Sequence, residues 1–334
     1  MKKFRMGIIG AGIFAEANIY PSLSLHFFDD VERAAVCDLN SERADRLTDK
    51  YGWKKTYTDY HKMIEKEYLD AVIIAIGAKA HPKIASDVLR LGLPIFLEKP
   101  VSIDIEGALQ ILDASKETGN IVQVDHQKRH GLAWNKAREI VSNTEEFGNI
   151  VQIESKQHGF TVFPTFYTCM LEWQSHNLDL IQSFGGEIEK VEAWSHLVND
   201  KHGSLIAMLR FKNDILATLG WGTFGGPGPY DERVEVISDK GKGVIVTNSR
   251  VVTYYDKKIG KTWTSNWDPV SENQSHVFNG YVGGLRNFID CVKGVEGKKP
   301  VPSIEDEVQT MYWLKEIAKK ANIDIKWDAV SSGL

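Results

Sequence analysis

The turn at residues 10–15 (GAGIFA) limits what this chain can fold into more than any other feature, because it joins an apolar run to a helical pattern. Gly10 permits a tight turn, and Gly12 lets the backbone approach a pyrophosphate at the positive end of the following helix. Ala15 is small enough for that helix to pack closely on its strand. Asp38 ends the second predicted strand, where an acidic side chain binds a ribose 2′-hydroxyl. Together they predict a dinucleotide-binding βαβ unit; an ordinary strand-to-helix turn followed by a capping aspartate is the alternative.

The first third of the chain alternates short apolar runs with amphipathic helical patterns. The run at residues 69–76 (LDAVIIAI) is almost continuously apolar, which is typical of a parallel strand buried on both faces. We predict strands at residues 5–9, 32–37, 69–76, 94–97 and 121–124, and helices at residues 41–51, 82–91 and 105–118. This alternation predicts an α/β fold with a doubly wound parallel sheet, a Rossmann domain, at residues 1–125.

Beyond residue 125 the pattern changes to successive strands joined by short turns. We predict strands at residues 149–157, 190–197, 204–211, 215–221, 233–238, 243–247 and 251–255, and helices at residues 132–142, 281–292 and 304–321. Short turns between successive strands favour antiparallel pairing. Residues 126–334 are therefore predicted to form a second domain of helices and an open, mostly antiparallel sheet.

The charge balance excludes several classes of partner. The 334 residues include 40 basic and 45 acidic side chains, a net charge of −5, without a long basic run, so we expect neither nucleic acid nor a membrane as a partner. No apolar stretch reaches the roughly 20 residues of a membrane-spanning helix. Cys37, Cys169 and Cys291 show no paired spacing, which argues against a disulfide framework or a zinc site and agrees with a cytoplasmic location.

Asp38 also bears on the choice of cofactor. A carboxylate at this position repels a 2′-phosphate and so favours NAD over NADP. Arg43 lies close by in the sequence and weakens that preference. We expect NAD as the cofactor, with NADP as the alternative.

The motif EKP at residues 98–100 follows the predicted strand at residues 94–97. By itself, a charged pair before proline is a solvated turn. After a Rossmann half, it resembles the EKP motif of the Gfo/Idh/MocA family of oxidoreductases. The resemblance extends over essentially the whole chain, through His81, the region around residues 172–179 and the closing helices. It implies a second domain that binds the substrate and, through its open sheet, forms a homodimer or homotetramer.

The resemblance assigns the EKP motif to the reactive part of the cofactor site. Lys99 would reach both the nicotinamide ribose and the reacting hydroxyl, aimed by a cis bond before Pro100. Glu98 would help to seat the nicotinamide, and His81 would lie along the cofactor groove unless it is only a helix-start histidine. The residues expected to bind the cofactor are Gly10, Gly12, Ile13, Phe14, Asp38, Ile76, Gly77, His81, Glu98 and Lys99.

The segment at residues 172–179 (EWQSHNLD) resembles the family pattern D-x-G-x-H-x-x-D. His176 and Asp179 match it, whereas Glu172 and Gln174 replace the usual aspartate and glycine. On a regular helix Glu172 and His176 share one face, so the carboxylate would orient the imidazole in catalysis. Gln174 would add bulk and hydrogen-bonding capacity close to the sugar, and the replacements indicate a substrate unlike that of the polyol dehydrogenases with the usual pattern. A metal site and a solvated helix face are the alternatives, and we expect no metal.

The second domain is also expected to supply the substrate contacts. These are Arg129, Tyr167, Trp173, Asn177 and Asp179. Family members often place an arginine at the position of Arg129, facing the cleft; a surface basic cluster is the alternative. Aromatic faces suit a pyranose, although aromatic side chains more often simply pack. Trp221 and Tyr230 border the glycine-rich loop at residues 222–231 and are candidates to form a lid.

The chemistry implied is hydride transfer at a secondary alcohol, which needs a base for the hydroxyl proton. Neutral His176 would take the proton while Lys99 stabilises the alkoxide, or Lys99 is the base if burial disfavours its charged form. The sequence leaves these two roles open. We expect an NAD(P)-dependent dehydrogenase acting on a sugar, cyclitol or glycoside. A glycosidase that retains NAD and oxidises its sugar transiently, and a non-catalytic NAD-binding regulator, are the alternatives.

Overall fold

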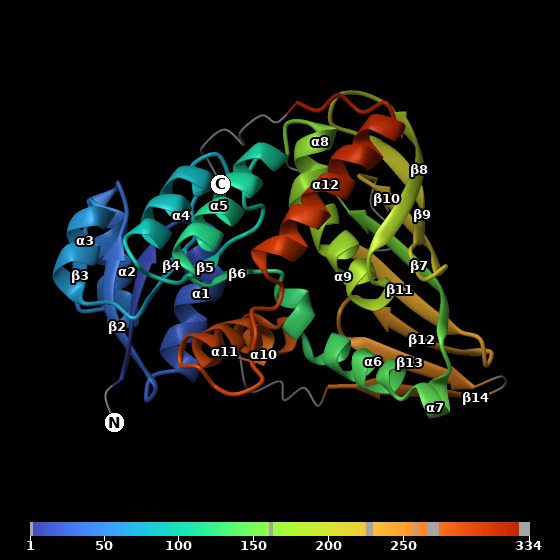
Figure 1. The fold of residues 1–334 in the computed structure, drawn as a ribbon, viewed down its shortest axis with the longest axis horizontal. Helices are drawn as coiled ribbons and strands as arrows, with labels where there is room; N and C mark the ends of the chain where they lie inside the picture. The colour runs from blue at the N-terminus through green and yellow to red at the C-terminus, as the bar shows by residue number, and fades with distance from the viewer. Residues whose placement is uncertain (1–2, 160–162, 225–229, 257–258, 266–273, 327–334) are drawn as a thin grey trace. The chain divides into compact units, whose positions relative to one another are not determined.

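The computed structural model describes residues 3–159, 163–224, 230–256, 259–265 and 274–326 (Figure 1). The chain forms two compact units. The first comprises Met1–Gln127 and Ser271–Val308, and the second comprises Lys128–Val270 and Gln309–Leu334. Our prediction had a single boundary after residue 125, whereas here the first unit also includes residues 271–308.

The first unit is built on a six-stranded parallel sheet with the order β3-β2-β1-β4-β5-β6. Its strands are β1 (Phe4–Ile9), β2 (Val31–Cys37), β3 (Lys55–Tyr57), β4 (Ala71–Ile74), β5 (Ile95–Leu97) and β6 (Val122–Val124). This is the strand order of a Rossmann fold, in which ligands bind beyond the carboxyl ends of the strands, where the order reverses. The predicted doubly wound sheet is confirmed, and its order reverses between β1 and β4.

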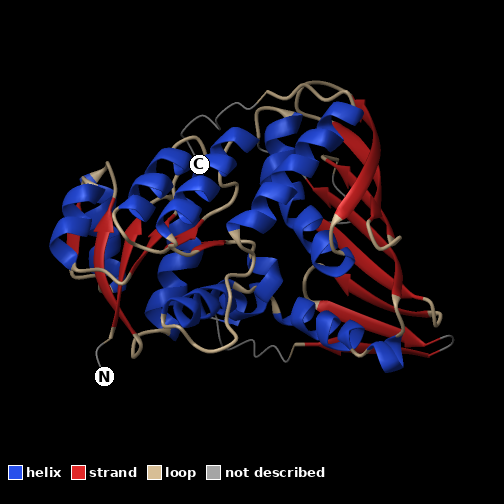
Figure 2. Ribbon diagram, in the orientation of Figure 1, coloured by secondary structure: helices blue, strands red, loops and turns tan. Residues whose placement is uncertain are grey.

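Helices lie on both sides of this sheet (Figure 2). They are α1 (Ile13–His26), α2 (Ser41–Tyr51), α3 (Tyr60–Glu67), α4 (His81–Arg90), α5 (Ile105–Thr118), α10 (Gln274–Asn279) and α11 (Tyr281–Val292). α2 and α5 end at Gly52 and Gly119, whose φ angles of 67° and 69° lie in the left-handed region that favours glycine. β3 and α3 were not predicted, because the three residues of β3 carry no apolar alternation.

α11 completes the core of the first unit, although it is far from the rest of that unit in sequence. The Phe288 ring packs against Phe96 of β5, with 5.7 Å between the ring centroids. Arg286 forms an ion pair with Asp30 at 2.7 Å. Because these contacts join distant parts of the chain, a domain boundary drawn from local sequence patterns misses them.

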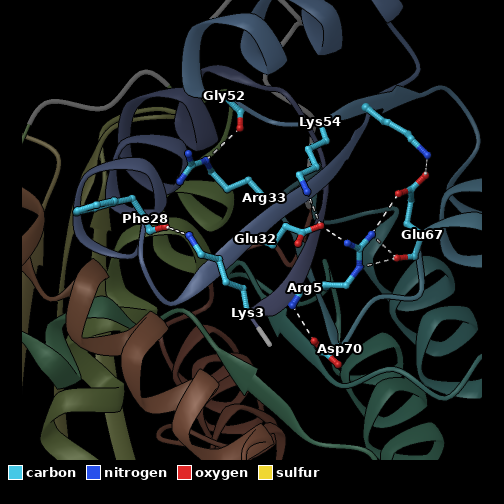
Figure 3. Close-up of polar contacts among 10 residues, drawn as sticks. Lys3, Arg5, Phe28, Glu32, Arg33, Gly52, Lys54, Glu67 and Asp70 are labelled. Carbon is cyan, nitrogen blue, oxygen red and sulfur yellow. Dashed lines mark hydrogen bonds and ion pairs between the residues drawn. The ribbon is translucent and has the colours of Figure 1, made fainter. Parts of the chain in front are cut away.

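Arg5 ties the amino end of β1 to its neighbours (Figure 3). Its guanidinium donates to the Glu67 carbonyl at 3.0 and 2.8 Å and contacts the Glu32 carboxylate on β2. Its backbone N–H donates to Asp70 Oδ2 at 2.7 Å. Arg5 therefore joins β2, the end of α3 and the turn before β4 at the edge of the sheet opposite the carboxyl ends.

The second unit is built on an eight-stranded sheet with the order β14-β13-β12-β11-β7-β10-β9-β8. Its strands are β7 (Ile150–Gly159), β8 (Ile188–Leu197), β9 (Gly203–Phe211), β10 (Leu216–Gly222), β11 (Tyr230–Ser238), β12 (Lys242–Thr247), β13 (Val251–Asp256) and β14 (Ile259–Thr264). The β7–β10 pair is parallel, and the other pairs are antiparallel. The predicted open, mostly antiparallel sheet is confirmed, with β14 as a strand that was not predicted.

The helices of the second unit pack along one face of its sheet (Figure 1). They are α6 (Leu132–Ser142), α7 (Thr144–Phe147), α8 (Phe166–Cys169), a π-helical turn at Met170–Gln174, α9 (Ser175–Gly185) and the later turns of α12 (Ile304–Lys320). On β9, buried Leu205 and Leu209 alternate with exposed Ile206 and Met208, so the other face is open. No helix in the described ranges is both long enough and apolar enough to cross a membrane.

Replacing Phe288 with alanine should lower the free energy of unfolding by about 3–5 kcal/mol, because it leaves a cavity against β5. Urea unfolding followed by circular dichroism measures the loss. Leu39→Ala is the matched control, since Leu39 is 93% exposed, and it should change stability by less than about 0.5 kcal/mol. A Phe288→Ala protein as stable as this control would contradict the place of α11 in the core.

Candidate functional site

The turn between β1 and α1 has the geometry of a pyrophosphate cradle. Gly10 has a φ of 115°, and a Cβ there would clash with the Ala75 carbonyl oxygen. Gly12 caps α1 without a side-chain hydrogen bond, and a Cβ at Gly12 would meet nothing within 4 Å. The first N–H groups of α1 therefore open onto free space, as anion binding at a helix N-terminus requires. The exposed side chains of Ile13 and Phe14 lie beside this space, so the residues present fit a dinucleotide.

Asp38, which directly follows β2, braces the same turn. Its Oδ2 accepts the Ala11 N–H at 2.7 Å, and its Oδ1 accepts the Asn40 N–H at 2.8 Å. Arg43 lies 3.6 Å from Oδ1, which is the proximity expected if it moderates the preference for NAD. A carboxylate with these two donors stays at the position where a ribose hydroxyl would bind.

Ile76 and Gly77 follow β4 and adjoin the turn at Gly10. A Cβ at Gly77 would meet nothing within 4 Å, so this backbone is also open to a ligand. His81 begins α4 but is 1% exposed, with its Nδ1 3.0 Å from the Pro100 carbonyl. Burial lowers the pKa of His81 to about 4, so the ring is neutral at pH 7. His81 therefore supports the EKP loop from behind and does not line an open groove, which differs from the expected placement.

Glu98 and Asp125 leave the sheet at neighbouring positions, directly after β5 and β6. The two strands are parallel, with Leu97 opposite Val124. The Asp125 N–H donates to the Leu97 carbonyl at 2.8 Å. Glu98 is 4% exposed and Asp125 is 2% exposed. Burial and the nearby Asp125 carboxyl raise the pKa of Glu98 well above its usual value, and burial raises the pKa of Asp125 to about 6.

Lys99 and Tyr281 adjoin this carboxyl pair. Lys99 is half-buried, its positive charge opposes the rise in the pKa of both carboxyls, and its bond to Pro100 is cis. Burial, together with the charges of Asp125 and Glu98, raises the pKa of the buried Tyr281 phenol. Neither Asp125 nor Tyr281 was among the predicted site residues. The position of Asp125, directly at the carboxyl end of a strand, is a signal that could have identified it.

In the second unit, the segment at residues 172–179 is not one regular α-helix, and that expectation was wrong. Met170–Gln174 forms a π-helical turn, and α9 begins at Ser175. A π-helical turn contains more residues than an α-helical turn. The α-helical spacing therefore does not predict the direction of the Glu172 side chain relative to that of His176. Glu172 is half-buried and His176 is 9% exposed, in the first turn of α9.

Gln174, the residue that replaces the usual glycine, is fully buried at the end of the π-helical turn. Its Nε2 donates to Gln157 Oε1 on β7 at 2.6 Å. The amide group is therefore used to attach the turn to the sheet. This differs from the expectation that Gln174 would add hydrogen-bonding capacity close to a sugar.

Two of the expected substrate contacts form an internal ion pair. Arg129 holds Asp179 with two bonds, Nε to Oδ2 at 2.6 Å and Nη2 to Oδ1 at 2.7 Å. The Asp179 side chain is fully buried, and the Arg129 side chain is 14% exposed. A bidentate pair of this kind fixes both side chains, so its role is to hold the 3-10 turn Gln127–His130, which precedes α6, against α9. We correct the expectation of direct substrate contact for Asp179, because its carboxylate is enclosed.

Asn177 is likewise enclosed in a buried polar network and does not reach a substrate directly. Its Oδ1 accepts from Lys128 Nζ at 3.0 Å, and its Nδ2 donates to Ser155 Oγ on β7 at 3.2 Å. Lys128 also pairs with the buried Glu232 carboxylate on β11. Lys128 and Glu232 were missed in the sequence, where nothing distinguishes Lys128 from a solvated neighbour of Arg129.

The aromatic residues of this region pack within the core. Tyr167 is 3% exposed, and the Trp173 ring packs edge-on against Phe163, with the centroids 6.3 Å apart. Trp221 is buried against Phe166 with 4.3 Å between centroids, so the expectation that it borders a lid is wrong. Most of the proposed lid loop and the Tyr230 side chain lie outside the described residues.

Metal binding is not indicated by the described part of the chain. No group of three or more His, Cys, Asp or Glu side chains there is arranged to hold an ion. Asp179, one of the three side chains in the metal alternative, has both carboxyl oxygens bonded to Arg129.

Comparison with known proteins agrees with this geometry. Residues 4–126 match the model of the Gfo/Idh/MocA oxidoreductase family, described as an oxidoreductase family with an NAD-binding Rossmann fold. The match covers the Rossmann part of the first unit. NAD is accordingly the cofactor of the first unit.

Three known proteins illustrate how far the similarity extends. The chain is 26% identical to myo-inositol 2-dehydrogenase of Thermotoga maritima over 90% of its length and 91% of that protein. It is 24% identical to 4-carboxy-2-hydroxymuconate-6-semialdehyde dehydrogenase of a Sphingobium species over 90% and 93%. The crystal structure of a dehydrogenase from Chromobacterium violaceum shares the fold, with a TM-score of 0.85, 20% identity and 96% of each chain covered. The two named dehydrogenases act on chemically different substrates, so the similarity leaves the substrate open.

The two glycines of the turn should respond differently to replacement by alanine. Gly12→Ala should keep its folding stability but bind NAD⁺ about tenfold more weakly or worse, because the methyl group occupies the cradle. Gly10→Ala should lose more than about 1 kcal/mol of stability, because of its positive φ and the clash with Ala75. Thermal unfolding and calorimetric titration measure the two effects. Unchanged NAD⁺ affinity in a folded Gly12→Ala protein would exclude this cradle as the binding site.

Proposed function

We propose that the protein is an NAD-dependent dehydrogenase that acts on a secondary hydroxyl of a sugar, cyclitol or glycoside. The observation that carries the proposal is Lys99, which stands at the carboxyl edge of a Rossmann sheet, in the same unit as an open pyrophosphate cradle. The resemblance to the EKP motif and the dehydrogenase relatives support it further. Histidine in the first turn of α9 supplies a second group able to move a proton.

The reaction needs one group to hold the hydroxyl proton and another to stabilise the alkoxide oxygen. His176 in its neutral form accepts the proton at an imidazole nitrogen while the Lys99 ammonium stabilises the oxygen, or Lys99 accepts the proton as a neutral amine. When bound, the nicotinamide ring takes up the hydride. Glu172 orients His176 in either assignment. Lys99, His176 and Glu172 are the proposed catalytic group.

The substrate proposal rests on fewer residues than the sequence suggested. Asn177 and Asp179 are enclosed, and Arg129 is committed to Asp179, so these three shape the site from behind. Glu172 remains as the residue that departs from the family pattern and is partly exposed.

Turnover should appear when the protein is mixed with NAD⁺ and a panel of pyranosides and inositols, as a rise in reduced-nicotinamide absorbance. Lys99→Ala and His176→Ala should each lower kcat by about a hundredfold or more, because each removes a group that handles the proton or the oxygen charge. Lys116→Ala and His61→Ala are matched controls on exposed positions and should leave kcat unchanged.

Two outcomes would redirect this assignment. Bond cleavage in a glycoside without net reduced nicotinamide would support the glycosidase that retains NAD. A non-catalytic regulator would be supported by two results together. The protein would bind NAD⁺ tightly but turn over none of the compounds, and the Lys99 and His176 substitutions would leave its NAD⁺ affinity unchanged.

We propose further that the open face of the second sheet joins copies of this chain in a homodimer or homotetramer. Trp194 on β8 and Ile206 on β9 are register partners, and each is 59% exposed. Met208 on β9 and Leu216 on the neighbouring β10 are also exposed. Exposed apolar side chains that gather on one sheet face are typical of an interaction site.

A Trp194→Glu substitution should convert the oligomer to a monomer, because a buried charge without a partner is costly at an apolar interface. Light scattering at micromolar concentration measures the mass. Leu39→Glu in the first unit is the control and should leave the mass of the oligomer unchanged. A monomeric wild-type protein at these concentrations would refute the proposal.

A further inference from the structure

Glu98 and Asp125 form a pair that the proposed reaction does not use. Each directly follows a strand, and the register of β5 and β6 sets the two residues opposite each other at the carboxyl edge. Their backbone N–H groups continue the sheet, with Glu98 donating to the Ile74 carbonyl at 2.9 Å and Asp125 donating to the Leu97 carbonyl at 2.8 Å. The backbone therefore fixes where both side chains start.

The two carboxyl groups are close enough for each to act on the pKa of the other. Among the described residues, no donor reaches Glu98 Oε1 or either carboxyl oxygen of Asp125. Two ionised carboxylates buried side by side repel strongly, and such pairs keep one proton between them. A shared proton supplies the donor that both groups lack.

The groups that face this pair carry little compensating charge. Lys99 follows Glu98 and acts on both carboxyls. Tyr281 at the start of α11 has a neutral phenol. On the β6 side, His126 Nε2 lies 2.6 Å from Glu307 Oε2, and on the α4 side the neutral His81 contacts Pro100. Lys99 and His126 both lower the pKa of Asp125, and of these two Lys99 also acts on Glu98.

We propose that Glu98 and Asp125 share one proton and together present a single negative charge to the Lys99 ammonium. Asp125 is then a positioning residue for Lys99, acting through Glu98. The inference rests on the proposed function only in giving Lys99 a role in catalysis. The sharing of the proton is a property of the protein without cofactor or substrate.

A shared proton has a distinctive consequence for amide substitutions. In Asp125→Asn, the asparagine N–H₂ donates to Glu98, which then holds the single negative charge. In Glu98→Gln, the charge moves to Asp125 in the same way. Each single variant keeps the charge that faces Lys99, and the double variant removes it.

The reactivity of the Lys99 amine in the protein without cofactor tests this consequence. The proteins are treated with acetic anhydride at pH 8, and the labelling rate of the Lys99 peptide is measured by mass spectrometry, with the exposed Lys116 as the internal reference. The single variants should label Lys99 at the wild-type rate within about twofold. The double variant should label it about tenfold faster, because losing an adjacent opposite charge favours the neutral, reactive amine by about this factor.

Two results would overturn the proposal. Two independent carboxylates would be indicated if each single variant raised the Lys99 labelling rate by a similar factor and the double variant raised it by the product of the two factors. A double variant that labels at the wild-type rate would indicate that the pair does not act on Lys99. Neither readout needs turnover, so failure of the dehydrogenase assignment is distinguishable from failure of this one.

The stability of the folded protein gives a second measurement for variants whose labelling is disturbed. Both carboxyls have folded-state pKa values above their unfolded values of about 4, so the stability they contribute is present below pH 4 and falls as pH rises. The share of Asp125 is lost as pH rises through about 6. Asp125→Asn removes one of the two titrations. Its urea midpoint should therefore rise relative to wild type between pH 5 and pH 8, and parallel curves would contradict the proposal.

Discussion

Parallel strands that end at one edge are the constraint on which the cofactor side of this protein depends. β1, β2, β4, β5 and β6 all run in the same direction, so the residues that follow them meet at the carboxyl edge. Gly10, Asp38, Gly77, Lys99 and Asp125 all come from this edge, although they span much of the first unit in sequence. A change in register at any one strand would move its group out of the site.

In the second unit, buried ion pairs position the residues of the proposed site, whereas in the first unit strand register positions them. Arg129 and Lys128 come from one short turn, and they hold Asp179 on α9 and Glu232 on β11. Removing one partner of such a pair leaves a buried charge without its counterpart, at a cost of about 3–5 kcal/mol. The Arg129–Asp179 pair and the Lys128–Asn177 hydrogen bond attach α9, which carries His176, to this turn.

Patterns that are local in sequence predicted much of the fold and only part of the site. Three features could be predicted because each depends only on residues adjacent in the chain. They are the GAGIFA turn, the apolar run through β4 and the glycine at the end of α5. The burial of Asn177 depends on its contact with Ser155 on β7. The packing of α11 in the core of the first unit depends on Phe96, which lies more than a hundred positions earlier in the chain. No local sequence pattern indicates either contact. The charged residues show this most clearly, because a lysine that pairs inside a core and one in solvent look alike in sequence.

Glu172 and Gln174, the two residues that depart from the family pattern, lie in different surroundings. Gln174 donates a hydrogen bond to Gln157 on β7. The glutamine that replaces glycine therefore attaches the turn to the sheet. The π-helical turn ends at Gln174, so the wider turn and the buried amide lie at the same point of the chain. Glu172 lies within that turn and is only partly buried. Glutamate places its carboxylate one methylene further from the backbone than aspartate, and the π-helical turn changes the direction in which that side chain leaves the helix.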